Sequence, residues 1–192
     1  MNELIITKAV QEDLPIILDV QRKAFLEVAK TFHLKSMPQI EQTLESLTAE
    51  FKNHTILKAS VANTPLITNS NAIADEPYNF KLNPMKLLDS RLRGNDEDNI
   101  TIVGSVRAYS KDGTCYINRL VVLPEYQNKG IGKLLMAQTE EQFKNSVQRY
   151  ELFTGSRDPR NLYLYDKLGY KTFKTEKHNE EISFVYMEKS VR

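Results

Sequence analysis

The sequence predicts an α/β protein in which one mixed sheet carries helices on its faces. Two observations support this prediction. Apolar residues recur with helical spacing in some stretches and with strand spacing in others, and the two kinds of stretch alternate along the chain. With 192 residues, of which 41% are hydrophobic, the chain is long enough for one domain with one core.

The first third of the chain predicts a strand, two helices and a second strand. A short strand is expected at residues 4–6. A helix is expected from Glu12 and another after Ser36, opened by Pro38. The apolar stripe of the first helix is interrupted by Gln21. The stripes consist of Leu14, Ile17, Leu18, Phe25, Val28 and Phe32 in the first helix, and of Ile40, Leu44, Leu47 and Phe51 in the second. The second strand is expected at residues 55–61.

The segment 62–99 shows no sustained period. It contains polar clusters with asparagine, three prolines and an acidic end. A structureless segment of this length is uncommon inside a compact domain. We therefore expect a flexible surface insertion within a single domain that spans residues 1–192, and a lid over an active site is the alternative. Residues 88–97 also resemble translated palindromic repeat elements, which would make the segment a passenger in the fold.

The remainder of the chain predicts five strands and two helices. The turn Lys111-Asp112-Gly113 favours a hairpin between the first two strands, and Gly169 stands where a helix typically ends. Strands are expected at 100–109, 114–122, 150–154, 170–177 and 182–188, and a short helix at 161–168. The preceding helix should present one face made of Ile131, Leu134, Leu135, Gln138 and Phe143.

Composition and charge exclude several classes of protein. Lys and Arg number 26 against 25 for Asp and Glu, and this balance argues against nucleic-acid binding through bulk charge. No apolar run approaches the ~18 residues of a membrane span, and no signal peptide is visible at the N-terminus, so a cytoplasmic protein without a membrane partner is expected. The single cysteine, Cys115, excludes an intrachain disulfide and a cysteine cage for a metal, and no metal site is expected.

The segment 121–133 carries the chemistry. A strand ends there, a polar turn follows, and Gly130-Ile131-Gly132 opens a helix. Glycines let a ligand approach the backbone, and free N–H groups at a helix start favour an anion such as phosphate. Lys129 and Lys133 add positive charge.

Two common phosphate-binding motifs do not fit this segment. A Walker loop needs a first glycine where Glu125 or Gln127 stands. A dinucleotide fingerprint needs a third small residue where Leu135 stands. The pattern Gln/Arg-x-x-Gly-x-Gly/Ala fits residues 127–132 throughout.

Through this motif the chain resembles the GNAT superfamily of N-acetyltransferases. In that family the loop binds the pyrophosphate of acetyl-coenzyme A (acetyl-CoA). A second segment, residues 161–170, is similar to the family's Asn…Leu-Tyr-x-x-x-Gly-Phe/Tyr motif. The resemblance implies the GNAT fold, a mixed, mostly antiparallel central sheet flanked by helices. The chain departs from the family by the long insertion between the second and third strands, which a tight hairpin usually joins.

The resemblance also implies a coenzyme site and a proton donor. The coenzyme would pair like an extra strand with the backbone of Leu120, Val121 and Val122. A backbone N–H near Val121 would stabilise the oxyanion. Asn161 would contact the pantetheine arm, and Tyr165, on the same helix face, would donate a proton to the leaving thiolate. The residues expected at the pyrophosphate are Gln127, Asn128, Lys129, Gly130, Ile131, Gly132 and Lys133.

The general base and the acceptor are not evident. The strand residues 116–119 offer no carboxylate, and Asn118 and Arg119 could shape the acceptor pocket. His54, just before a predicted strand, could act as base, and a plain surface position is the alternative.

We expect transfer of an acetyl group from acetyl-CoA to a primary amine, directly and within a ternary complex. The acceptor, a small molecule or a protein amine, is unidentified, and the chain would act as a monomer or homodimer. One alternative is a non-catalytic module that binds and senses acyl-coenzyme A. Another is an interaction protein whose insertion recruits a partner.

Overall fold

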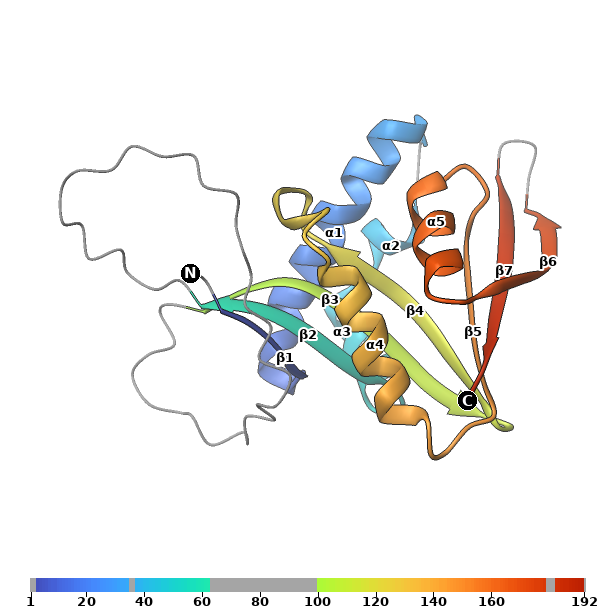
Figure 1. Ribbon diagram of the computed structural model, residues 1–192. Coiled ribbons are helices and arrows are strands. Elements are labelled where there is room, and N and C mark those ends of the chain that lie inside the picture. The colour runs from blue at the N-terminus through green and yellow to red at the C-terminus, as the bar shows by residue number, and fades with distance from the viewer. Residues whose placement is uncertain (1–2, 35–36, 63–99, 179–181, 192) are drawn as a thin grey trace, which may run out of the picture.

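The computed structural model describes residues 3–34, 37–62, 100–178 and 182–191. Its centre is a seven-stranded sheet with the order β1-β2-β3-β4-β5-β7-β6. All neighbouring strands are antiparallel except β4 and β5, which are parallel. The predicted mixed, mostly antiparallel sheet is therefore confirmed (Figure 1). The strands are β1 (Leu4–Lys8), β2 (Thr55–Ala62), β3 (Ile100–Lys111), β4 (Thr114–Val122), β5 (Arg149–Gly155), β6 (Lys171–Lys177) and β7 (Ser183–Ser190).

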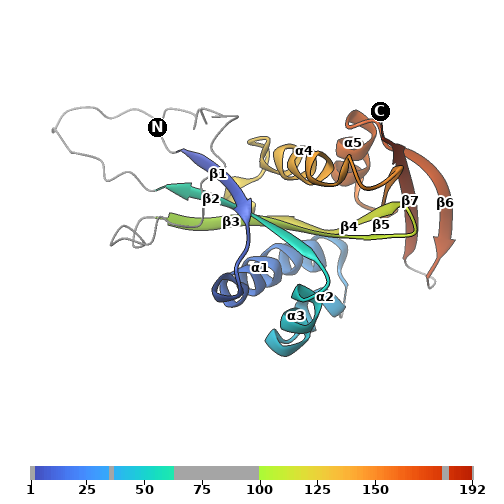
Figure 2. The ribbon, with the colours of Figure 1, turned by 90° about the horizontal axis from the view of Figure 1, so that it is seen from below.

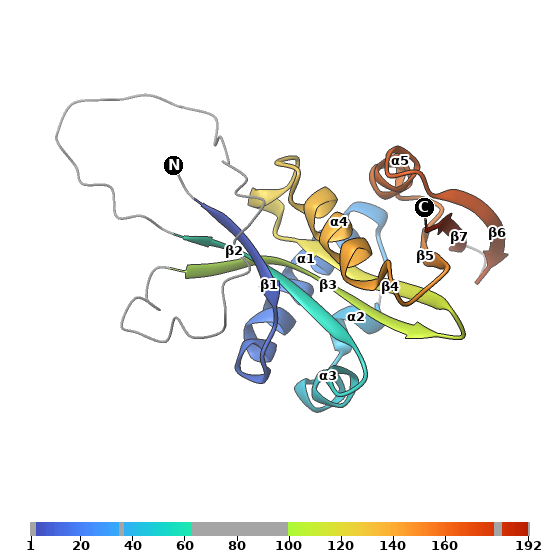
Figure 3. The same ribbon diagram turned by 60° about the horizontal axis from the view of Figure 1, so that its bottom comes forward.

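Helices lie on both faces of the sheet. Those that precede β2 lie on one face, and those that follow β4 lie on the other (Figure 2). Strands β1 to β3 form one end of the sheet and β5 to β7 the other (Figure 3). Within the described ranges, no helix combines the length and the apolar character needed to cross a membrane. The helices are α1 (Leu14–Phe32), α2 (Pro38–Glu41), α3 (Leu44–Phe51), α4 (Ile131–Phe143) and α5 (Pro159–Lys167), with 3-10 turns η1 (Gln11–Asp13) and η3 (Pro124–Tyr126).

The prediction of a single helix after Ser36 is wrong, because the chain breaks there into α2 and α3. Thr43 is the N-cap of α3 and accepts a hydrogen bond from the N–H of Ser46 at 3.2 Å. The N–H groups in the first turn of a helix have no acceptor within the helix, and a threonine at the N-cap accepts from one of them. Gln42, next to it, is buried and takes part in a polar network.

This network joins the three N-terminal helices to β3. The guanidinium of Arg107 is fully buried and donates to Gln21, to Gln42 at 3.1 Å and to Glu50 at 2.7 Å. Gln42 donates in turn to Glu50 at 2.7 Å and accepts from Gln21 at 3.0 Å. Gln21 is thus a buried partner and not an interruption of the apolar stripe. Because a buried charge without partners costs several kcal/mol, the network fixes the helices over β3.

The predicted face of α4 is partly wrong. Gln138 is exposed, and the neighbouring Thr139 is buried in its place, with its hydroxyl donating to the carbonyl of Leu135 at 2.8 Å. That bond lets a polar residue lie on the apolar side of the helix. Ile131, Leu135 and Phe143 are buried as predicted. Gly169 follows the end of α5 with φ of 92°, as expected for a residue after a helix.

The predicted insertion at 62–99 lies outside the described residues, apart from Ala62, which ends β2. Ala62 pairs with Ile100, the first residue of β3. The chain therefore leaves the sheet and returns to it at the same place. We propose that residues 1–192 form a single domain and that 63–99 are an insertion in the β2–β3 connection.

Replacement of residues 63–99 by an Asn-Gly turn should raise the free energy of unfolding by about 1–3 kcal/mol, because a shorter connection has a smaller closure entropy. Asn-Gly favours the turn that a two-residue hairpin needs. Urea denaturation of both chains measures the difference. A shortened chain that is less stable, or that no longer unfolds cooperatively, would show that the segment belongs to the core of the domain.

Candidate active site

Strands β4 and β5 pair over three residues and then diverge. The pairs are Thr114 with Arg149, Cys115 with Tyr150, and Tyr116 with Glu151. Beyond them the two strands lead away from each other, as Figure 1 shows. The facing edges lack the strand neighbour that backbone groups normally find in the middle of a sheet. An extended ligand can bind to such an edge through main-chain hydrogen bonds.

A β-bulge in β4 lies at the start of the divergence. The register between β3 and β4 shifts between Ser105 and Arg107, and Arg119 has φ of 52°. A bulge bends its strand and increases the local twist. A non-glycine residue in this backbone region is strained, and such residues cluster at functional sites.

The backbone of Val122 points away from β3. The N–H of the next residue, Leu123, donates to the Val103 carbonyl of β3 at 2.8 Å, so Val122 faces the opposite side. The carbonyl of Val122 accepts instead from the side chain of Gln127 at 3.0 Å.

The backbone groups of successive strand residues point alternately to the two edges of the strand, so Leu120 and Val121 face opposite sides. Leu120 has the orientation of Val122 and presents its backbone groups to the β5 side. The carbonyl of Val121 lies against β3, where a Cβ on Gly104 would meet it at 2.8 Å. Of the three predicted residues, Leu120 and Val122 therefore offer backbone groups to a ligand between β4 and β5.

The loop after β4 ends at a helix start that no side chain caps. Gly130 is the N-cap of α4 and accepts the first intrahelical hydrogen bond, from Leu134, at 3.1 Å. The N–H groups of Ile131, Gly132 and Lys133 consequently have no acceptor within the helix. The helices α3 and α5, by contrast, have capping side chains.

The backbone of this loop is held in a conformation that suits anion binding. Asn128 has φ of 60° and Gly130 has φ of 81°. Asparagine and glycine are the residues that adopt this region at least cost. Open N–H groups at a helix start, together with the positive end of the helix dipole, favour an anion such as phosphate.

The residues predicted to contact the pyrophosphate also include two lysines and an isoleucine at the start of α4. The ammonium of Lys129 lies 5.1 Å from the centre of the Tyr126 ring, and Lys133 is exposed. The side chain of Ile131 is buried in the core, so this residue can contribute its backbone N–H to a ligand but not its side chain.

Helix α5 begins beside the loop. The guanidinium of Arg160 donates to the side-chain oxygen of Gln127 at 3.2 Å. Gln127 therefore links the end of β4 to the start of α5. Arg160 is not among the residues predicted from the sequence, because only the fold brings this helix to the loop.

The first turn of α5 is fixed by Asp158. Its carboxylate accepts from the backbone N–H of Asn161 at 3.1 Å and from the side-chain amide of Asn161 at 2.9 Å. The side-chain carbonyl of Asn161 is the group that can accept a hydrogen bond from a ligand.

Helices α4 and α5 and strand β4 meet at Gly132. A Cβ on this residue would lie 3.7 Å from Leu164 and 3.8 Å from Leu120. There is room for a methyl group, and a larger side chain would occupy the space between the strand and α5.

Tyr165 is the buried residue of α5, with 6% of its surface exposed. Its ring packs edge-on against Tyr170, with the ring centres 6.0 Å apart. Burial, aided by the negative charge of Asp158, raises the pKa of Tyr165 well above its ordinary value. The phenol therefore keeps its proton at physiological pH.

His54 is the candidate general base and Asn118 a candidate acceptor contact. Neither lies at the junction of β4, α4 and α5. His54 is beside α3, with Nδ1 2.9 Å from the carbonyl oxygen of Glu50 and its ring 4.8 Å from that of Tyr109. Asn118 pairs with Arg107 across β3 and β4. Among the described residues, no group of three or more His, Cys, Asp or Glu side chains could hold a metal ion.

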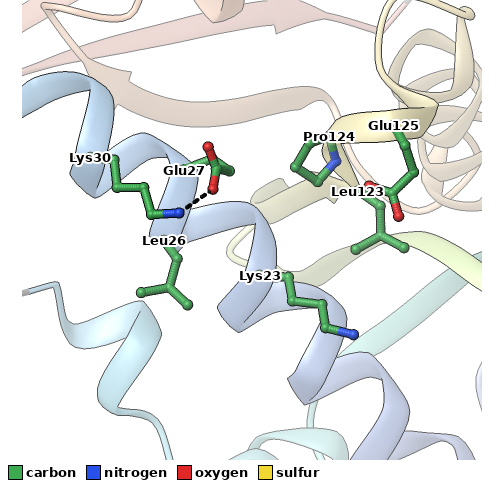
Figure 4. Close-up of a pocket in the computed structure, with 7 residues that line it drawn as sticks. All are labelled: Lys23, Leu26, Glu27, Lys30, Leu123, Pro124 and Glu125. Carbon is green, nitrogen blue, oxygen red and sulfur yellow. Dashed lines mark hydrogen bonds and ion pairs between the residues drawn. The ribbon is translucent and has the colours of Figure 1, made fainter.

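A pocket of about 320 Å³ lies between α1 and the start of the loop after β4 (Figure 4). None of the predicted site residues lines this pocket, and neither do the residues whose N–H groups are open at the start of α4. Its lysines are already paired, Lys30 with Glu27 at 2.7 Å and Lys23 with Asp19 at 2.8 Å. The pocket is lined by Lys23, Leu26, Glu27, Lys30, Leu123, Pro124 and Glu125.

Residues 93–191 match the family model described as the acetyltransferase (GNAT) domain. The chain belongs to the GNAT acetyltransferase family. As a member it is an acyltransferase, and acetyl-CoA is the family's acyl donor. No curated protein matches the chain in sequence.

Solved structures of GNAT acetyltransferases share the fold. PaiA N-acetyltransferase from Thermoplasma acidophilum, solved in complex with coenzyme A, has a TM-score of 0.65 at 20% identity, over 97% of this chain and 98% of that one. The ribosomal-protein-S18-alanine N-acetyltransferase from Escherichia coli has a TM-score of 0.64 at 12% identity, over 100% and 94%. A GNAT acetyltransferase from Streptococcus pneumoniae has a TM-score of 0.64 at 17% identity, over 98% and 99%.

Gly130→Ala should raise the dissociation constant for acetyl-CoA about tenfold, because the bound loop must hold a side chain at a φ that costs about 1–2 kcal/mol. A clash is not involved, since a Cβ there has no atom within 4 Å. Gly113→Ala is the matched control, because Gly113 has φ of 74° in the β3–β4 turn and a Cβ there meets Gln148 at 3.8 Å. Calorimetric titration measures all three proteins, and equal affinities would refute the assignment of the loop.

Proposed function

We propose that the chain transfers the acetyl group of acetyl-CoA to a primary amine, directly and within a ternary complex. The observation that carries the proposal is the junction of the diverging strands with the uncapped start of α4. An unpaired strand edge suits the extended pantetheine arm. The N–H donors at the end of this edge suit the pyrophosphate.

In this proposal the predicted residues hold the coenzyme in three zones. The backbones of Leu120 and Val122 pair with the pantetheine arm, and Val121 supports them from the side of β3. Asn161 contacts the arm from α5. The pyrophosphate lies among Gln127, Asn128, Lys129, Gly130, Ile131, Gly132 and Lys133, whose contributions are mainly backbone N–H groups.

The chemical step forms one bond and breaks one. The amine attacks in its unprotonated form, so an alkylamine with a pKa of about 10.4 must first lose a proton. A C–N bond forms at the thioester carbonyl carbon, and the C–S bond breaks. Tyr165 gives the departing thiolate its proton, and the proton that the nitrogen loses as the amide forms restores the phenol by way of solvent. The oxyanion is stabilised by the backbone N–H of Leu120 or Val122, because these groups point away from β3. The N–H of Val121 faces β3 and is less well placed.

We further propose a cytoplasmic enzyme whose partners are acetyl-CoA and the acceptor amine, without nucleic acid or membrane. The near-neutral charge of the sequence and its single cysteine support this. A protein amine is a possible acceptor for this fold, since the Escherichia coli relative is named for acting on an alanine of a ribosomal protein.

Tyr165→Phe should lower kcat about 10²–10³-fold and leave the dissociation constant of acetyl-CoA nearly unchanged, because it removes a proton donor and little packing. Thiol release with an amine panel measures kcat, and calorimetry measures binding. Tyr163→Phe is the control, since Tyr163 is 65% exposed on the same helix. Because the pKa of Tyr165 is raised, wild-type activity should not fall near pH 10, where an exposed tyrosine ionises.

Equal kcat in wild type and Tyr165→Phe would remove this residue as the acid. Binding of acetyl-CoA without transfer to any amine would favour the alternative, a module that senses acyl-coenzyme A.

A further inference from the structure

One face of the sheet carries aromatic side chains beyond the point where β4 leaves β5. Residues on β5 alternate between the two faces. The hydroxyl of buried Tyr150 donates to the Glu140 carbonyl of α4 at 2.7 Å, so Tyr150 and Leu152 face α4. Phe153 therefore lies on the opposite face, the one that α1 to α3 cover elsewhere, and it is 46% exposed.

Four rings from three strands form one surface there, which we call the aromatic platform: Phe153, Phe173, Phe184 and Tyr186. Phe153 of β5 contacts Phe184 and Tyr186 of β7, with ring centres 5.2 and 5.5 Å apart. Phe173 of β6 contacts Tyr186 at 6.3 Å. On β7 the alternate residues, Val185 and Met187, are buried on the α4 side.

No described helix covers the platform. Helices α1, α2 and α3 lie over β2 to β4 on this face, and α4 and α5 lie on the other face (Figure 2, Figure 3). Phe173 is 44% exposed, close to the value for Phe153. Contiguous exposed apolar surface of this kind commonly marks a site of interaction.

The platform adjoins the reaction site of the proposed function. Phe153 is the second β5 residue after the last β4–β5 pair, Tyr116 with Glu151. The proposed coenzyme phosphates lie at α4, on the opposite face of the sheet. An amine that reaches a thioester between the two strands can therefore approach over the platform.

The edge of the platform nearest the last β4–β5 pair carries an excess of negative charge. Glu151 and Glu188 pair across β5 and β7, and both accept from Arg149 at 2.6 Å. Two carboxylates share this guanidinium, which leaves a net charge of −1. Lys174 on β6 pairs with Glu176 at 2.6 Å and also interacts with Glu151, so the three carboxylates and two cations around the rings still leave a net charge of −1.

The rings themselves already accept cations from the chain. The ammonium of Lys174 lies 5.0 Å from the centre of the Tyr186 ring, and the guanidinium of Arg149 lies 5.8 Å from that of Phe173. Aromatic faces attract cations through their quadrupole. The platform thus combines an apolar surface with attraction for positive charge.

We propose that the aromatic platform binds the acceptor, and that the acceptor is a primary amine carried on an aromatic body, of the arylalkylamine class. The proposal rests on the proposed acetyltransferase function. The aromatic body packs on Phe153 and Tyr186, and the amine lies toward Glu151, beside the coenzyme. Amines without an apolar body, such as polyamines and lysine, gain only the attraction of the rings for their charge and not the packing on them.

Tryptamine is a suitable probe, because the chain contains no tryptophan. Indole fluorescence excited beyond the tyrosine absorption band then reports binding of tryptamine alone. Thiol release gives kcat/KM for tryptamine and phenethylamine, and for spermidine and lysine as comparison. The expected kcat/KM is at least about tenfold higher for the two arylalkylamines.

Phe153→Ala and Tyr186→Ala should each raise the dissociation constant and the KM of tryptamine about tenfold, because each removes a ring that the ligand packs on. The dissociation constant of acetyl-CoA should not change. Tyr163→Ala is the matched control, because it removes an aromatic residue that is 65% exposed on α5 and outside the platform.

Each failure has a distinct signature. If wild type binds no acetyl-CoA, the proposed function is wrong and the acceptor proposal falls with it. If it binds acetyl-CoA and acetylates spermidine or lysine with the same kcat/KM as tryptamine, the acceptor proposal alone is overturned. If it binds acetyl-CoA and acetylates none of the amines, the acceptor proposal is overturned and the sensing module is favoured over the proposed function. If Phe153→Ala turns a dimer into a monomer and leaves tryptamine binding unchanged, a second copy of the chain covers the platform and the acceptor proposal is again overturned.

Discussion

The site depends on the short pairing between β4 and β5. Three residue pairs hold the strands together, and a bulge at Arg119 bends β4 away beyond them. Unpaired backbone groups inside a protein cost about 1–3 kcal/mol each unless another partner is found. Gln127 supplies one such partner at Val122, and a coenzyme arm would supply the rest. The open strand edge therefore suits the proposed binding of the coenzyme, because the sheet leaves it incomplete.

The rest of the fold holds this edge open from both faces. On one face, the buried guanidinium of Arg107 ties α1 and α3 to β3, the neighbour of β4. On the other, α4 starts directly after the loop, and Gly132 lets it approach β4 and α5 closely. Charge follows the same division, with open N–H donors on the α4 face and an excess of carboxylate beside Arg149 on the opposite face. In the proposed function, an anionic donor and a cationic acceptor would thus meet complementary faces of one gap.

Local patterns in the sequence predicted most of the strands and the loop at 127–132, because alternation, turns and glycine spacing involve near neighbours. The errors involve distant contacts. Gln21 resembles an interruption of a helix until Arg107, 86 residues away, becomes its partner. The contact of Arg160 with Gln127, 33 residues away, likewise exists only in the folded chain. The break at Thr43 is the exception, because the N-cap contact with Ser46 joins residues only three apart. Phe153 lies in a predicted strand, but which sheet face the helices leave uncovered is a property of the assembled layers.

The central claim is that acetyl-CoA binds at the start of α4 beside β4. Amide spectra of the protein labelled with ¹⁵N-glycine test it most directly, because glycines lie both inside and outside this site. The account predicts that acetyl-CoA shifts the amide signals of Gly130 and Gly132 and leaves those of Gly113 and Gly169 in place. Unchanged signals at Gly130 and Gly132 in the presence of saturating acetyl-CoA would contradict it.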